Sequence, residues 1–188
     1  MSQEANLQFS NLDTQLNWYA LRVTYSRELV LKAYLDSEGI ESFIPMRYEY
    51  ILKDGHPVRK LVPAVHNLVF VRSSRNCIDA IKESQIMTSP IRYIMDREYH
   101  CPVIVPDSQM RSFMAVSCNY DQSLLYFEPS ELNLRKGTRV RITHGLFAGV
   151  EGEFIRVRND RRVVVSIEGV MAVATTFIHP SFVEPIDK

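Results

Sequence analysis

The stretch KGTRVRITHGLFAGVEGEFIRVR, residues 136–158, carries the strongest structural signal in this chain. A basic, β-branched segment leads into a loop of the form Gly-x-Phe-x-Gly, and a second strand-like segment follows. Gly145 and Gly149 can adopt the positive φ angles that a tight turn needs, and Gly152 permits a close backbone approach. Phe147, between the two loop glycines, is expected to fill a small core. These residues predict two strands joined by a structured loop.

The segments after this stretch continue the same pattern. Five short strands are predicted at residues 137–143, 150–158, 161–167, 171–177 and 181–186. A hairpin turn is expected at Asn159 and Asp160. Short strands at this spacing favour a small all-β barrel. Four arginines surround the predicted turn, and they can either bind RNA or simply keep the surface solvated: Arg156, Arg158, Arg161 and Arg162.

The N-terminal part has a different order of elements. Strands are predicted at residues 18–24, 40–52, 58–62, 67–72 and 91–95, with helices at 26–38, 75–85 and 106–119. Ser26 is a plausible N-cap of the first helix, and Gly39 a plausible C-cap glycine. Asp54 and Gly55 favour a tight hairpin. This order predicts an α+β domain with a largely antiparallel sheet. Residues 1–16 are interpreted as a flexible tail and residues 121–134 as a linker.

Composition narrows the class of protein. The chain has 188 residues, of which 46% are hydrophobic and 23% charged, as in globular proteins of one medium or two small domains. The net charge is zero, but residues 132–188 carry nine basic and six acidic side chains. Such a mildly basic segment can bind nucleic acid or form an ordinary solvated surface. Three cysteines without a CxxC pair, no signal peptide and no long apolar run predict a cytoplasmic protein without a membrane partner.

Motifs for catalysis are not found in the sequence. It contains no GxSxG, P-loop, GxGxxG or HExxH pattern, and its five histidines are isolated from one another. We therefore expect no catalytic residues, no metal and no cofactor, and the chain is not expected to be an enzyme.

Two sets of residues resemble one known family. The pattern of Gly145, Phe147, Gly149 and Gly152 resembles the KOW motif of NusG-type transcription factors and some ribosomal proteins. Four features of the first domain resemble the N-terminal (NGN) domain of NusG: NWYALRV, FIP, a glycine-containing hairpin and NLVFVR. The segment PVIVP resembles the specialised paralogue RfaH. Asn67 and the N-terminal extension look most like the UpxY group, which is associated with capsular polysaccharide operons.

The resemblance implies a fold and a function. The fold would be an α+β NGN domain over residues 17–120, with an antiparallel sheet and flanking helices, and an SH3-like KOW barrel over residues 135–188. The implied function is transcription elongation and antitermination on RNA polymerase at a specific operon. The alternatives are a general NusG-like elongation factor and a KOW-type protein that binds RNA or the ribosome.

The resemblance also implies roles for individual residues. An apolar groove that receives the clamp helices of RNA polymerase would contain Tyr19, Val65, Leu68 and Phe70, for which the other interpretation is the hydrophobic core. Contacts with non-template DNA or nascent RNA would come from Arg22, Thr24, Tyr25, Arg27 and Arg92. A hairpin tip that reaches across the polymerase cleft would contain Lys53, Asp54, Gly55 and His56.

The implied KOW domain departs from general NusG factors at one position. Glu168 stands where those factors have an apolar residue that contacts Rho or a ribosomal protein. This charge favours a specialised role, although a ribosomal protein remains a candidate partner. The β-branched residues of the segment 162–177 disfavour a helical alternative, so we expect a stable barrel. The protein is expected to be a monomer.

Overall fold

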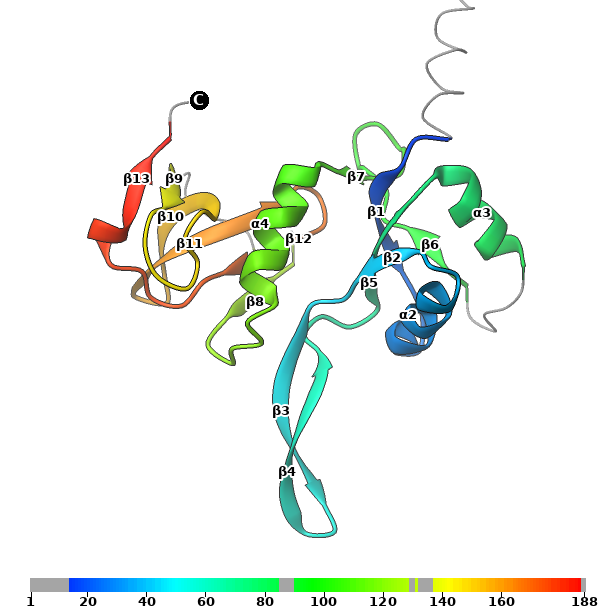
Figure 1. Cartoon of the computed structure of the whole chain (residues 1–188), viewed down its shortest axis with the longest axis horizontal. Coiled ribbons are helices and arrows are strands. Elements are labelled where there is room, and N and C mark those ends of the chain that lie inside the picture. The colour runs from blue at the N-terminus through cyan, green and yellow to red at the C-terminus, as the bar shows by residue number, and fades with distance from the viewer. Residues whose placement is uncertain (1–13, 85–89, 129–130, 132–136, 187–188) are drawn as a thin grey trace, which may run out of the picture. The chain divides into compact units, whose positions relative to one another are not determined.

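The computed structural model describes residues 14–84, 90–128, 131 and 137–186, which form two compact units (Figure 1). Unit 1 contains the residues up to Ile44 together with His66–Asp107, and unit 2 contains Pro45–Val65 and the residues from Ser108 onward. The predicted domains 17–120 and 135–188 divide the chain differently. The central hairpin and the last helix, both assigned to the first domain from sequence, belong to the second unit.

Unit 1 is built on one antiparallel sheet. Its strands are β1 (Asn17–Arg22), β2 (Glu41–Phe43), β5 (Leu68–Ser73), β6 (Arg92–Tyr93) and β7 (Ile104–Val105). They follow the order β2-β5-β1-β6, and β7 also pairs with β1. The four consecutive residues WYAL of β1 are all buried, as expected for a central strand with both faces covered. Helix α2 lies against β2 and β5, and helix α3 follows β5 in the chain. The predicted mixture of sheet and helices is confirmed.

The two helices that the structure describes in unit 1 begin differently, since the N-cap residue of α2 makes no side-chain hydrogen bond and that of α3 does. Helix α2 (Glu28–Ser37) has Arg27 at its N-cap, so the prediction of Ser26 as the cap is wrong. Ser26 has a φ of +51° and belongs to the preceding turn. Helix α3 (Arg75–Glu83) is capped by Ser74, whose hydroxyl accepts from the Cys77 N–H at 3.2 Å.

Unit 2 contains a hairpin, a helix and a second sheet. The hairpin consists of β3 (Met46–Lys53) and β4 (His56–Pro63), and helix α4 spans Asp107–Ser117. The sheet, here called the C-terminal sheet, has the order β13-β9-β10-β11-β12-β8. Its strands are β8 (Leu125–Phe127), β9 (Thr138–Ile142), β10 (Glu151–Val157), β11 (Asp160–Ile167), β12 (Met171–Ala174) and β13 (Val183–Pro185), with a 3-10 turn η1 (Pro180–Phe182) before β13.

Two expectations about this sheet need correction. Residues 121–134 were predicted to be a linker, but Leu125–Phe127 pair with β12. The turn between β10 and β11 lies at Arg158 and Asn159, with φ values of +49° and +72°, one residue earlier than predicted. The all-β character is confirmed, although within the described residues the ladder ends at β13 and β8 and these two strands do not pair.

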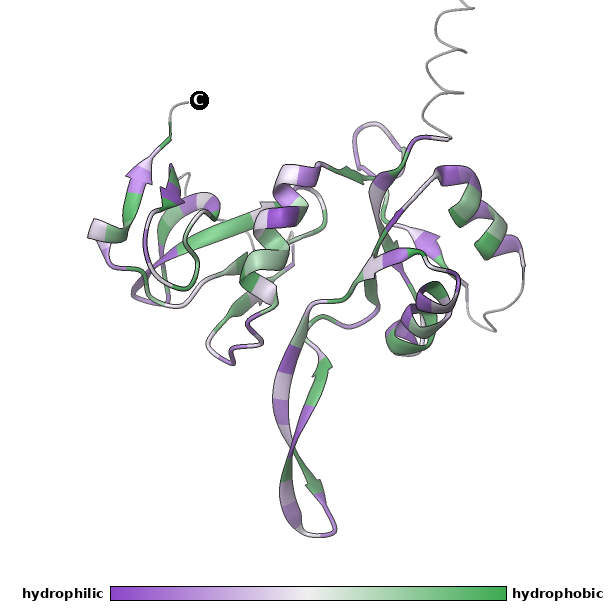
Figure 2. Ribbon diagram, viewed as in Figure 1, coloured by the Kyte–Doolittle hydropathy of each residue, from purple (hydrophilic) through white to green (hydrophobic). Residues whose placement is uncertain are grey.

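The hydrophobic core of the C-terminal sheet lies along β11. Figure 2 shows this strand as predominantly hydrophobic, whereas the colours alternate along the β3–β4 hairpin. Val157, Val164, Ala172 and Ala174 form a buried cluster, against which Leu125, Phe127 and Ile155 pack. None of the helices in the described residues is long and apolar enough to span a membrane.

The glycine loop between β9 and β10 has the predicted geometry. Gly145 and Gly149 have φ values of +86° and +87°, and the Gly149 N–H donates to the Ile142 carbonyl at 2.7 Å. Phe147 is buried, as expected. A Cβ atom at Gly152 would lie 2.4 Å from the Val164 carbonyl oxygen. Gly152 therefore allows the close approach of β10 and β11.

Gly152→Ala tests this close approach. Because the clash is with backbone, we expect the substitution to lower the free energy of opening β10 and β11 by about 3 kcal/mol. Gly149→Ala is the control, since no atom lies within 4 Å of its Cβ position and only the positive φ should cost, about 1 kcal/mol. Amide hydrogen exchange measures both losses, and equal losses would contradict the close-approach explanation.

Candidate nucleic-acid interface

The turn between β1 and α2 presents an exposed aromatic side chain. Arg22 ends β1, and the chain then turns through Tyr25 and Ser26, whose φ values are +60° and +51°. Positive φ is uncommon for a bulky residue and persists only where the surroundings impose it. The side chain of Tyr25 is nevertheless 82% exposed, so its own packing does not impose this conformation.

Asn67, which precedes β5, holds this turn in place. Its backbone carbonyl accepts from the Val23 N–H at 3.0 Å, and its side-chain oxygen accepts from the Ser26 N–H at 3.1 Å. Its own N–H donates to the carboxylate of Glu28, which is almost completely buried at the start of α2. Residues separated by about forty positions are thus joined by three hydrogen bonds.

Arg22 and Arg92 lie directly opposite each other on β1 and β6. Both side chains are exposed, and among the described residues neither forms an ion pair. Like charges in directly opposed positions are unfavourable, and an anion between or beside them would relieve the repulsion. The predicted nucleic-acid residues Arg22 and Arg92 are therefore brought together. Arg27 and Tyr25 lie at the adjoining turn, as does Thr24, whose buried hydroxyl has no partner among the described residues.

A pocket next to Arg92 extends this basic surface. It has a volume of about 600 Å³ and is lined by α3, β6 and the segment that contains Cys101. Asp79 pairs with both Lys82 at 2.9 Å and Arg75 at 3.7 Å. Burial raises the pKa of the Tyr93 phenol, and the Asp79 carboxylate raises it further. Tyr93 therefore stays neutral, and the cationic side chains of the pocket outnumber its one carboxylate.

The four residues predicted to bind polymerase lie in a different environment. Tyr19, Leu68 and Phe70 have exposures of 2%, 5% and 0%, whereas Val65 is half-buried. Tyr19, Leu68 and Phe70, which belong to unit 1, are covered and do not form an exposed groove within the described part of that unit. The alternative interpretation, core residues, fits the burial of three of them, and the polymerase-binding role stays a prediction.

The tip of the β3–β4 hairpin has the geometry expected from its sequence. Lys53, Asp54, Gly55 and His56 are all exposed, with Asp54 and Gly55 at positive φ. Tyr50 and Leu52, two residues apart on β3 and hence on one face, are also exposed. Sequence reasoning did not single out these two, although the alternation in YEYIL signals a strand with two distinct faces.

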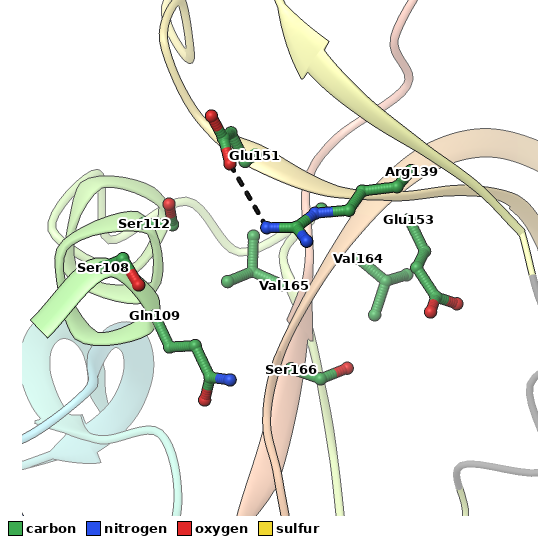
Figure 3. Close-up of a pocket in the computed structure, with 10 residues that line it drawn as sticks. Ser108, Gln109, Ser112, Arg139, Glu151, Glu153, Val164, Val165 and Ser166 are labelled. Carbon is green, nitrogen blue, oxygen red and sulfur yellow. Dashed lines mark hydrogen bonds and ion pairs between the residues drawn. The ribbon is translucent and has the colours of Figure 1, made fainter. Parts of the chain in front are cut away.

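A smaller pocket within unit 2 was not foreseen from sequence. Figure 3 shows Ser108, Gln109 and Ser112 of α4 facing Arg139, Glu151 and Ser166 of the C-terminal sheet. Its volume is about 260 Å³, and Arg139 pairs with Glu151 across 3.4 Å. The Gln109 side-chain oxygen is buried and has no hydrogen-bond partner within the described part of the chain. These polar groups do not form a recognisable catalytic arrangement.

Metal-binding clusters are not found where the structure is described. No group of three or more histidine, cysteine, aspartate or glutamate side chains in residues 14–84, 90–128, 131 and 137–186 is placed to hold a metal ion.

Comparisons with known proteins identify the family. No curated protein matches this chain. A solved structure titled "Domain interaction in Thermotoga maritima NusG" aligns with 92% of this chain and 98% of its own, at 19% identity and a TM-score of 0.45. A family model described as "Transcription termination factor nusG" matches residues 16–114, more than half of the chain. The chain therefore belongs to the NusG family.

Proposed function

We propose that this chain acts on RNA polymerase as an operon-specific elongation factor, which suppresses pausing or termination in transcription of an operon such as one for capsular polysaccharide. Members of the NusG family are non-enzymatic factors of transcription elongation or termination that bind RNA polymerase, and this chain belongs to that family. The proposal adds the specialised role, the operon and the surfaces that this chain would use.

The observation that carries the proposal is the turn held by Asn67. A single DNA strand displaced in the transcription bubble offers unstacked bases and phosphates. An exposed aromatic ring can stack on such a base, and neighbouring arginines can bind the phosphates. Tyr25 provides the ring, and Arg22 and Arg92 the charges. Because the turn is fixed before binding, less conformational entropy is lost on contact.

The β3–β4 hairpin supplies a candidate second contact with polymerase. Its tip carries Lys53 and His56, and Tyr50 and Leu52 expose apolar surface beside it. The Arg59 guanidinium on β4 lies 3.7 Å from the centre of the Tyr48 ring on β3, so a cation–π contact joins the two strands of the hairpin. A factor that spans the cleft and binds the active polymerase more tightly than the paused one would shift the population toward elongation.

The general-factor alternative is disfavoured by Glu168. This residue lies in the turn between β11 and β12 and is exposed. A charge there opposes the apolar contact that the resemblance implies for general factors. The third alternative, an RNA-binding KOW protein without polymerase contact, is disfavoured by the family match over residues 16–114.

Substitution of Tyr25 tests the proposed stacking. Tyr25→Ala should weaken binding of a fluorescein-labelled 16-nucleotide DNA strand by about 1–3 kcal/mol, because the loss of one base–aromatic stack costs this much. Tyr25→Phe is the matched control and should bind like the unaltered chain. Fluorescence anisotropy gives the affinities. Equal binding by all three proteins would refute the role of the ring.

Transcription assays test the operon-specific role. The purified chain should co-purify with core RNA polymerase and increase read-through on a capsular operon template, with no effect on an unrelated template, in single-round transcription. An increase on both templates would support the general-factor alternative. A folded chain that failed to bind polymerase would contradict the proposal.

A further inference from the structure

The end of the C-terminal sheet at the β10–β11 turn carries a second concentration of positive charge. Arg156 and Arg161 lie directly opposite each other on the two strands, and Arg158 occupies the turn. All three side chains are exposed, and none forms an ion pair among the residues that the structure describes. As at Arg22 and Arg92, directly opposed like charges favour an anion nearby.

The fourth arginine near this turn, Arg162, differs from the other three because its side chain is buried. Arg162 is only 8% exposed and donates to the carbonyls of Thr175 at 2.7 Å and Ser123 at 2.9 Å. It also pairs with Asp160 at 3.2 Å. Arg162 therefore ties the sheet to the segment before β8 and neutralises the turn's own carboxylate. Arg162 is therefore a buried structural residue and not part of a solvated surface, whereas the other three remain available to a ligand.

Aromatic surface accompanies these charges. Phe177 is 54% exposed, and it immediately precedes Ile178, whose N–H donates to the Arg161 carbonyl at 2.9 Å. Phe154 is half-buried, and the Arg161 guanidinium lies 5.9 Å from the centre of its ring. Among the described residues 119–124, which include the Ser123 carbonyl that accepts from Arg162, Asp121 carries the one carboxylate, and it accepts from Ser123. An excess of positive charge remains even with Asp121 counted.

We propose that this end of the C-terminal sheet is a second binding site, which takes a single strand of nucleic acid. Arg156, Arg158 and Arg161 would bind successive phosphates, and Phe177 would stack on an unpaired base. Double-stranded nucleic acid fits less well, because its bases are already stacked on one another. The site is separate in sequence from Arg22, Tyr25 and Arg92, and it stands or falls independently of the operon-specific role.

The test uses the full chain with the first surface removed. In a background of Arg22→Gln, Tyr25→Ala and Arg92→Gln, fluorescence anisotropy with labelled 16-nucleotide RNA and DNA strands of one sequence should still detect binding. Adding Arg156→Gln and Arg161→Gln should weaken that binding about tenfold or more. The slope of log affinity against log salt should fall by about 1.4, because each lost phosphate contact contributes about 0.7 for a single strand.

Matched variants separate this site from a general charge effect. Arg139→Gln with Arg141→Gln removes the same charge from the same sheet, where both arginines pair with Glu151, and should change affinity less than twofold. Arg156→Lys with Arg161→Lys keeps the charge and should retain most of the binding. Phe177→Ala should weaken binding of a single strand about fivefold or more.

Each result of these binding measurements either supports or overturns the proposed site. Tighter binding of the RNA strand would support the site and indicate the nascent transcript as its ligand. Equal binding of both strands would support a site that recognises the phosphates and unpaired bases common to RNA and DNA. Absence of binding in the background, equal loss in the Arg139 and Arg141 control, or tighter binding of the corresponding duplex would each overturn the proposal. Amide hydrogen exchange on every variant verifies that the sheet remains folded.

Discussion

The hydrogen bonds of Asn67 are the constraint on which the candidate interface depends. They join the end of β1, the turn before α2 and the start of β5 at one residue. Asn67 itself has a φ of +63°, a conformation that asparagine tolerates better than most residues. The buried Glu28 side chain accepts from its N–H, so a polar group taken out of water keeps a hydrogen-bond partner. This junction is therefore the restraint that we assign to the left-handed conformation of Tyr25.

The chain separates residues that build the fold from residues that are available to partners, even where both are of one type. Arg162 is buried in carbonyl contacts, while Arg156 on the paired strand is exposed. Tyr19 is buried in β1, while Tyr25, six residues later, is exposed. In each pair the neighbouring strands and turns decide whether the side chain is buried or exposed. Two basic and aromatic surfaces result, one on each compact unit.

Much of this architecture could be predicted from local sequence. The hairpin at Asp54 and Gly55 and the glycine loop before β10 depend on residue types whose backbone preferences act over a few positions. Arg22 and Arg92 could be named as candidate nucleic-acid contacts from sequence, and that role stays a prediction, but their opposition across β1 and β6 follows only from the strand register.

Features that depend on distant contacts could not be predicted in this way. Ser26 has the sequence of a helix cap, but its N–H bonds to Asn67 and places it in the turn. The strand β8 is only three residues long and is defined by pairing with β12, some forty-five positions away. An apolar pattern also cannot distinguish an exposed groove from a covered face, and Tyr19 and Phe70 lie on covered faces.

Asn67→Gly tests the central claim most directly. Glycine permits the same positive φ and keeps both backbone hydrogen bonds, so the substitution removes only the side-chain acceptor of the Ser26 N–H. Affinity for the labelled DNA strand should fall to the level of Tyr25→Ala, while hydrogen-exchange protection of the β1 and β5 amides stays unchanged. Unchanged affinity would mean that the Asn67 side chain does not position Tyr25, and it would contradict this account of the interface.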